Sequence, residues 1–150
     1  MSFSSSAKED LVKIRLKTRE QRLAQLAGLV HTCGALTIGR VRGVSFTSET
    51  LAVGKHIVSL ATALYELDPT IELSERERRR PLTVVTLTGD AVERMLSDVG
   101  LLYLEQGDYR IGETVPEALL SDEEGKRAFL RGAFLGSGSC SNPYRGYHLE

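Results

Sequence analysis

Apolar residues recur at two different spacings along this chain, and the spacing distinguishes expected helices from expected strands. Spacings of three and four residues predict helices at 7–16, 18–34, 49–67, 90–99 and 121–135. Short apolar or alternating stretches predict strands at 35–38, 44–48, 70–80 and 82–88. From residue 18 to residue 100 the order is helix, two strands, helix, two strands, helix. This order predicts an α+β fold, in which helices cover one face of an antiparallel sheet and the other face is open.

Polar residues, glycine and proline set the expected boundaries of these elements. Three helices begin with Ser or Thr followed three residues later by Glu or Gln, which is the capping-box pattern. The pairs are Ser6 with Glu9, Thr18 with Gln21, and Ser121 with Glu124. Gly34 follows the second helix, as glycine at a helix C-terminus commonly does. Pro81 predicts a turn between the last two strands, and Gln106-Gly107-Asp108 predicts a short hairpin.

Two nine-residue segments carry a similar arrangement of small residues 104 positions apart. They are LAGLVHTCG at 26–34 and LRGAFLGSG at 130–138. Small residues recur every four positions in both helices, which places them on one helix face. We expect the two faces to pack together, because small residues let helix backbones approach closely; the alternative is two unrelated Ala/Gly-rich core helices. The expected interface residues are Ala24, Gly28, Thr32, Ala128, Gly132 and Gly136.

These segments resemble the signature helices of LAGLIDADG homing endonucleases, and residues 18–100 have the element order of one LAGLIDADG repeat. The resemblance implies an N-terminal helix, a first repeat, a linker and a truncated second repeat. The corresponding ranges are 1–17, 18–100, 101–120 and 121–150. The last residue corresponds to Phe46 of the first repeat. We therefore expect an N-terminal fragment, or a second half that is completed from outside the chain.

The resemblance also locates the residues that would carry catalysis. In such nucleases an acidic residue precedes the final glycine of each signature helix, and the two acids hold divalent metal over the scissile phosphates. The matching residues here are Cys33 and Ser137, and the earlier Asp of the motif is matched by His31 and Leu135. Neither helix ends in a carboxylate. We therefore expect no catalytic residue, no metal site, no cofactor and no metal-dependent nuclease activity.

Three longer segments resemble the WhiA family of bacterial sporulation and cell-division transcription regulators. They are MSFSSSAKEDL, LAGLVHTCGAL and GKRAFLRGAFLGSGSCSNPYRGYHLE. The resemblance implies a catalytically inactive homing-endonuclease-like domain and a C-terminal helix-turn-helix domain that is absent here. It also implies double-stranded DNA as a partner, bound mainly by that absent domain, and a role in regulating sporulation or cell division.

Charge is distributed unevenly, although the net charge is only −1. Residues 1–80 hold 13 Lys/Arg against 9 Asp/Glu, a net +4, whereas residues 81–150 hold 6 against 11, a net −5. Arginines at the tip of the first hairpin and on one face of the 70–80 strand are candidates for contacting DNA phosphates. They are Arg40, Arg42, Arg76, Arg78 and Arg80.

Other interpretations of these charges stay open. Glu72, Glu75 and Glu77 are interspersed with the arginines, so the strand can also be a solvated charged face or a guarded edge. The acidic stretch 90–124 suits a basic protein regulator or a solvated linker better than DNA. In this second hypothesis the chain is a protein-interaction scaffold that positions the absent helix-turn-helix and does not itself bind DNA.

Composition disfavours several further classes. No apolar run is long enough to span a membrane and the N-terminus lacks a signal peptide, so we expect a cytoplasmic, nucleoid-associated protein. Cys33 and Cys140 are isolated, which disfavours a disulfide framework or a zinc site. The glycines around Ser137 follow a helix and make a poor phosphate loop for a metabolic enzyme. A strand beginning near Gly146 would allow a homodimer.

Overall fold

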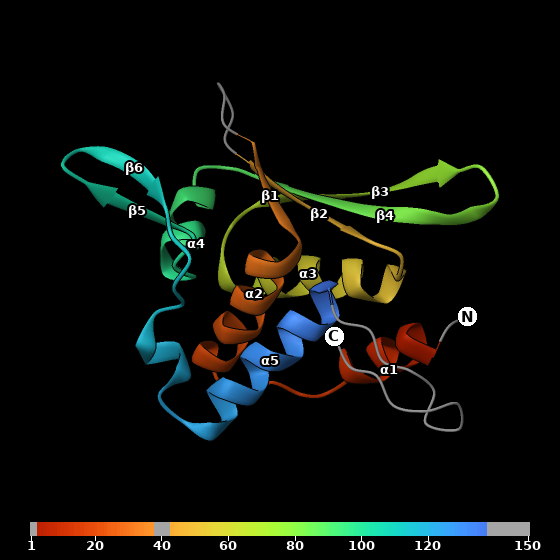
Figure 1. Cartoon of the computed structure of the whole chain (residues 1–150), viewed down its shortest axis with the longest axis horizontal. Coiled ribbons are helices and arrows are strands. Elements are labelled where there is room, and N and C mark those ends of the chain that lie inside the picture. Colours follow the sequence, from red (N-terminus) through yellow and green to blue (C-terminus); the bar gives the residue numbers. More distant parts are fainter. Residues whose placement is uncertain (1–2, 38–42, 138–150) are drawn as a thin grey trace.

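The computed structural model describes residues 3–37 and 43–137. Arg40, Arg42, Cys140 and the strand expected from Gly146 lie outside these residues. The elements within them are α1 (Phe3–Leu11), α2 (Arg19–Cys33), β1 (Gly34–Thr37), β2 (Gly43–Ser48), α3 (Leu51–Leu64), β3 (Asp68–Arg76), β4 (Arg79–Thr88), α4 (Val92–Asp98), β5 (Leu102–Glu105), β6 (Asp108–Ile111), the 3-10 helix η1 (Glu117–Leu120) and α5 (Glu123–Ser137) (Figure 1).

Four strands form one antiparallel sheet in the order β1-β2-β4-β3, and α2 and α3 pack beneath it (Figure 1). The register pairs Val44 with Leu87 and Phe46 with Val85. All four side chains are at most 1% exposed, so the helix-facing side of the sheet belongs to the core. The helices in Figure 1 leave the opposite side of the sheet uncovered. This arrangement confirms the predicted α+β architecture with helices on one face of an antiparallel sheet.

The register also settles the orientation of β4, which the sequence left ambiguous. Thr83, Val85 and Leu87 are buried and point toward the helices. Val84 and Thr86 alternate with them and therefore point to the open side.

The observed starts of the two signature helices differ in how well the sequence predicts them. Thr18 caps α2 as predicted, because its hydroxyl accepts a hydrogen bond from the backbone N–H of Gln21 at 3.1 Å. The prediction that Ser121 begins α5 is wrong by one residue. The Asp122 carboxylate accepts the backbone N–H of Gly125 at 2.7 Å and occupies the capping position instead.

The N-terminal helix starts earlier than predicted. It spans Phe3–Leu11 rather than 7–16, so Ser6 lies inside the helix and not at its start. α1 packs against α3 and α5, and such tertiary contacts commonly override the weak local preference of serine for helix ends.

Gly34 ends α2 for a steric reason rather than a conformational one. Its φ of −79° and ψ of 136° are extended values that any residue adopts, and it is the first residue of β1. A Cβ at this position would lie 2.7 Å from the carbonyl oxygen of Val30. The prediction that the helix ends at Gly34 is therefore confirmed.

The turn between β3 and β4 lies at Glu77–Arg78, so the prediction of a turn at Pro81 is wrong. Arg78 adopts a φ of 61°, which lies in the left-handed region that non-glycine residues visit uncommonly. Pro81 lies within β4, beyond the last pair with β2, which joins Ser48 to Thr83. Within the described residues β4 has only β3 beside it there, so the missing N–H of proline is tolerated.

The segment between the two signature helices contains the predicted hairpin and the 3-10 helix η1. β5 and β6 pair around Gln106 and Gly107, whose φ values are 52° and 86°. Two consecutive left-handed residues are typical of the type I′ turn that joins tight hairpins.

Among the described helices, none has both the length and the apolar character needed to cross a membrane.

Candidate functional site

The close contact between α2 and α5 is the central feature of the molecule (Figure 1). A Cβ on Gly28 would collide with the carbonyl oxygen of Phe129, and a Cβ on Gly132 would collide with the carbonyl oxygen of Gln25. The two helices therefore touch backbone to backbone at these glycines. Larger side chains at either position would force the helices apart.

The other four residues of the expected interface lie on the same two helices. Ala24 is fully buried on α2 and Ala128 is 1% exposed on α5. A Cβ on Gly136 would collide with the Thr32 hydroxyl, so the contact continues to the C-terminal ends of both helices. The Thr32 hydroxyl itself donates to the carbonyl oxygen of Gly28 at 2.7 Å.

A polar network crosses this contact and links three helices. Arg131 on α5 donates from Nη1 to Gln25 Oε1 at 2.9 Å, and Gln25 Nε2 lies 2.6 Å from His56 Nε2 on α3. Burial, assisted by the Arg131 charge, lowers the pKa of His56 to about 4. The ring is therefore neutral at pH 7, and its Nε2 accepts a hydrogen bond from the Gln25 amide N–H. Sequence reasoning missed Gln25 and Arg131, because no local pattern indicates a polar pair 106 positions apart.

The C-terminal ends of α2 and α5 meet, and they hold Cys33 and Ser137, the residues that the resemblance matches to the catalytic acids of LAGLIDADG nucleases. A Cβ on Gly136 would lie 3.3 Å from Cys33 Sγ. Burial raises the pKa of the Cys33 thiol to about 11, against a smaller lowering by the Lys8 charge. The thiol is therefore protonated at pH 7, and a protonated thiol is a poor metal ligand.

Lys8 of α1 brings a positive charge to this meeting point. Its ammonium nitrogen lies 5.7 Å from the ring centroid of Phe134 on α5. Burial lowers the pKa of Lys8, whereas attraction to Cys33 and to Glu49 raises it. Sequence reasoning missed Lys8, because nothing in the spacing of α1 shows which helices it packs against.

A cavity of about 380 Å³ lies beside these helix ends. Its lining includes Lys8, Glu49, Gly136, Ser137 and several Ser and Thr hydroxyls. Divalent metals such as Mg²⁺ require an oxygen-rich, anionic ligand set. One carboxylate beside an ammonium and a protonated thiol does not supply it, so these residues do not fit the metal of the related nucleases. Across residues 3–37 and 43–137, no three His, Cys, Asp or Glu side chains are grouped as metal ligands.

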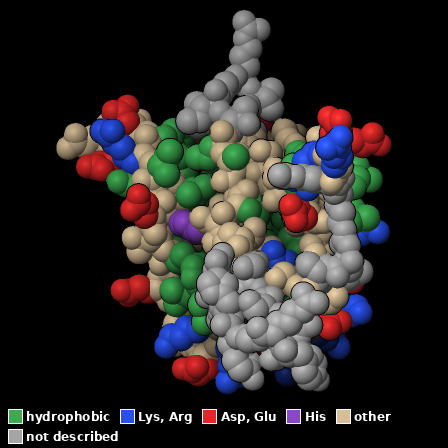
Figure 2. Space-filling view, turned by 45° about the vertical axis from the view of Figure 1, so that its right-hand side comes forward, with side chains coloured by type: hydrophobic (Ala, Val, Ile, Leu, Met, Phe, Trp, Pro, Cys, Tyr) green, Lys and Arg blue, Asp and Glu red, His purple; other side chains and the backbone are tan. Residues whose placement is uncertain are grey.

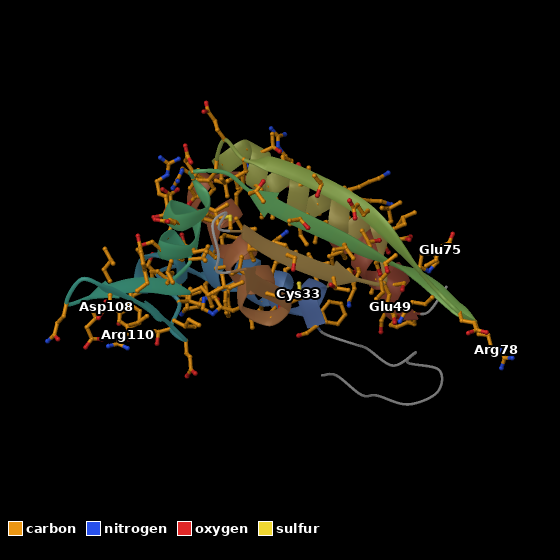
Figure 3. The ribbon with its side chains drawn as sticks, turned by 90° about the horizontal axis from the view of Figure 1, so that it is seen from above. Cys33, Glu49, Glu75, Arg78, Asp108 and Arg110 are labelled. Carbon is orange, nitrogen blue, oxygen red and sulfur yellow. The ribbon has the colours of Figure 1, made fainter. Side chains whose placement is uncertain are left out.

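The arginines expected on one face of β3 are not arranged that way. Arg76 lies 3.3 Å from Glu49 Oε1 and forms an ion pair with it. Arg78 is exposed in the turn, well away from Cys33 in Figure 3. Arg80 belongs to β4, and its side chain lies outside the described part. The prediction of one common face is wrong because the strand ends at Arg76 and an irregularity between Ser74 and Arg76 breaks the alternation.

The described residues on the open side of the sheet form a largely uncharged surface. By register they include Ser45, Thr47 and Val84, with Glu72 on β3. In the face shown in Figure 2, Lys and Arg side chains alternate with Asp and Glu around the periphery and do not gather into one basic patch. By register, the described open-side residues named here supply no positive charge for phosphates.

Comparison with known proteins now identifies the family. The WhiA N-terminal LAGLIDADG-like domain matches residues 19–102, and the WhiA LAGLIDADG-like domain matches residues 126–150. A "Probable cell division protein WhiA" from Thermoanaerobacter sp. (strain X514) is 32% identical over 100% of this chain and 49% of its own length. The protein of the same name from Pediococcus pentosaceus is 36% identical over 100% of this chain and 48% of its own length. The chain therefore spans about half the length of the curated relatives it matches.

Two solved structures share the fold. Full-length DUF199/WhiA from Thermatoga maritima superposes with a TM-score of 0.70 at 23% identity, over 99% of this chain and 44% of that one. The N-terminal LAGLIDADG domain of DUF199/WhiA superposes with a TM-score of 0.72 at 24% identity, over 99% of this chain and 64% of that one. Fold, family matches and relatives agree with the resemblance found in the sequence, and the chain belongs to the WhiA family of LAGLIDADG-like proteins.

Proposed function

We propose that this chain is a regulatory, non-cleaving LAGLIDADG-like part of a bacterial transcription regulator that acts in cell division or sporulation. The observation that carries the proposal is the meeting point of α2 and α5. There the helices keep their backbone contact at Gly28 and Gly132, but their ends present Cys33 and Ser137 beside the Lys8 ammonium. A helix pair that keeps its contact without the ligands for a catalytic metal is suited to binding DNA or to positioning other parts of the regulator.

The proposed absence of cleavage can be tested directly. We expect supercoiled plasmid DNA to stay intact when the purified chain is incubated with Mg²⁺ or Mn²⁺. The matched variant is Glu49→Gln, because Glu49 is the carboxylate that lines the cavity at the helix ends. Metal-dependent cleavage by the chain that is lost in Glu49→Gln would refute the proposal.

Within this function, we place the DNA contact of the chain at the β3–β4 turn rather than on the open sheet face. Arg78 is exposed at the end of a hairpin that extends beyond the helices (Figure 3). Such a tip can reach phosphates while the rest of the sheet stays uncharged. Each neutralised phosphate releases counterions, so the contact would weaken as salt rises.

A scaffold that does not bind DNA is the second candidate, and one observation favours it. Arg76, the arginine nearest the body of the sheet, is paired with Glu49, which reduces the charge available to a phosphate. In that case DNA would be bound only by other parts of the regulator, and this chain would orient them or dock another protein.

A salt series of duplex DNA binding separates the two candidates. The test variant is Arg78→Glu with Arg80→Glu, and the matched control is Lys126→Glu with Arg127→Glu on the exposed side of α5. Binding by the unmodified chain and by the control, with loss in the test variant, supports the contact at the turn. Equal binding by all three refutes the contact at the turn and also the scaffold, because the chain would then bind DNA elsewhere on its surface. Binding by none near physiological salt refutes the contact at the turn and leaves the scaffold.

A further inference from the structure

The hairpin formed by β5 and β6 stands away from the rest of the molecule (Figure 1). Its strands pair from Leu102 with Ile111 to Glu105 with Asp108. Leu102 is 9% exposed and anchors the hairpin in the core. The Tyr109 hydroxyl donates to Glu93 Oε2 on α4 at 2.8 Å. The hairpin is therefore held at its base and along one side, while its outer surface faces solvent.

The surface of this hairpin is unusually apolar for an exposed element. Tyr103, Leu104, Tyr109 and Ile111 are 47%, 64%, 44% and 61% exposed. These four are among only ten exposed large hydrophobic side chains in the described residues. Concentration of apolar surface on a protruding element is characteristic of binding surfaces. A two-stranded hairpin is also marginally stable by itself, and a further strand would stabilise it.

A hollow lies at the base of the hairpin and provides a place for an incoming side chain. Its volume is about 510 Å³, and its lining includes Leu102, Tyr103, Ile111 and Glu113. The apolar members suit the aliphatic part of a side chain, and the carboxylate of Glu113 suits a cationic end. Lys and Arg combine these two properties.

The hairpin and the residues next to it carry a net negative charge. Residues 102–113 contain three acidic residues, Glu105, Asp108 and Glu113, and one basic residue, Arg110. Glu105 and Asp108 are exposed at the tip, where Figure 3 shows Asp108 and Arg110. Such a surface repels DNA and anionic lipid and attracts cationic protein segments. The exposed rings of Tyr103 and Tyr109 add faces on which Lys or Arg can stack.

We infer that the β5–β6 hairpin, residues 102–111, docks an extended, basic segment of a partner protein. The segment adds as a strand beside β5 or β6, since within the described part of the chain each of these strands has one edge with no strand beside it. Its apolar side chains cover Leu104, Tyr109 and Ile111, which share one face of the hairpin by register. Its Lys or Arg side chains lie on the other face with Glu105 and the Tyr103 ring, and one of them reaches Glu113 in the hollow. This inference goes beyond the proposed function and does not depend on whether the β3–β4 turn binds DNA.

The inference is tested with synthetic peptides and the purified chain. The probe is a short fluorescent peptide that alternates Arg or Lys with Val, and the control peptide carries Glu in place of every basic residue. We expect saturable binding of the basic peptide by fluorescence anisotropy, with amide chemical-shift changes concentrated in β5 and β6. Equal binding of the acidic peptide, or shift changes confined to other elements, would overturn the inference.

Two pairs of variants distinguish binding at the hairpin from non-specific binding of the peptide. Glu105→Lys with Glu113→Lys is expected to weaken binding at least tenfold, and both residues are exposed, so the fold is retained. Leu104→Ser with Ile111→Ser is expected to weaken it similarly. The matched control is Ile71→Ser with Leu73→Ser, which removes comparably exposed apolar side chains from β3. Unchanged affinity in the charge-reversed pair, or an equal loss in the β3 control, would contradict docking at the hairpin.

Discussion

α2 and α5 carry the same stripe of small residues, yet their surroundings differ. Leu26 on α2 is fully buried, whereas Leu130, its counterpart 104 positions later, is 65% exposed. In α2 every residue from Leu23 to Val30 is buried, because α5 covers one side and the sheet covers another. In α5 the buried residues are those that face α2 or the 3-10 helix η1, which precedes α5 in the chain. The stripe therefore specifies the contact between helices, and the burial of the flanking side chains depends on whether a sheet lies beside them.

Breaking the shared contact is expected to have the largest effect. Gly28→Val and Gly132→Val each place a Cβ against a backbone carbonyl of the opposite helix, which cannot rotate away. We expect each to lower the free energy of unfolding by about 3 kcal/mol or more, measured by urea denaturation. Thr62→Val, at an exposed position of α3, is the control and should change it little. A tolerated valine at either glycine would show that the helices are not in backbone contact.

The difference between the two helices is sharpened by a matched pair of leucine substitutions. Leu26→Ala removes a fully buried side chain and should lower the free energy of unfolding by about 2–5 kcal/mol. Leu130→Ala removes a mostly exposed one and should change it by less than about 0.5 kcal/mol. Both are measured by urea denaturation of the same chain. Equal losses would mean that Leu130 is covered in solution, for example by a second copy of the chain. The free energy of unfolding would then depend on the protein concentration.

The most gradual expected effect is a pH dependence from the network that joins α2, α3 and α5, because it is spread over the range from pH 6.5 to pH 4. His56 has a pKa of about 4 in the folded chain against an ordinary value of 6.5. The unfolded chain therefore binds a proton that the folded chain does not, so stability present above pH 6.5 is lost as the pH falls toward 4. The slope approaches about 1.4 kcal/mol per pH unit.

Urea denaturation at several pH values between 4 and 6.5 measures this slope. His56→Gln should flatten it, because no titrating ring remains beside Gln25. Arg131→Met should narrow the pH range over which stability changes, because loss of the nearby positive charge lets the pKa of His56 rise. An unchanged slope in His56→Gln would assign the pH dependence to other groups.

The features that sequence predicts well here are those set by local geometry. Spacing by four placed Gly28 and Gly132 on facing helix surfaces, and the Thr18–Gln21 pair marked the start of α2. The hairpin around Gly107 was also predictable, since Gln106-Gly107-Asp108 is a local turn sequence. Each of these depends on a few neighbouring positions along the chain.

The features that sequence predicted poorly depend on neighbours distant in the chain. Pro81 indicated a turn, but it lies in a strand because β2 ends before reaching it. Arg76 was expected to share one strand face with Arg78 and Arg80, but β3 ends at Arg76, and Glu49, between β2 and α3, is its ion-pair partner. Gln25 and Lys8 were missed for the same reason, since their roles follow from the packing of α5 and α1. The candidate site was therefore located from sequence, but its charges were not.

The contact between Gly28 and Gly132 also has a consequence for synthesis on the ribosome. The two glycines are 104 positions apart, and translation adds roughly 5–20 residues per second. The small-residue face of α2 therefore leaves the ribosome about 5–20 seconds before α5 is available to cover it. Throughout that interval the nascent chain can build the sheet on α2 but cannot close the helix pair. Arrival of α5 accordingly covers this face, and a pause in translation before residue 123 would prolong exposure of the small-residue face of α2.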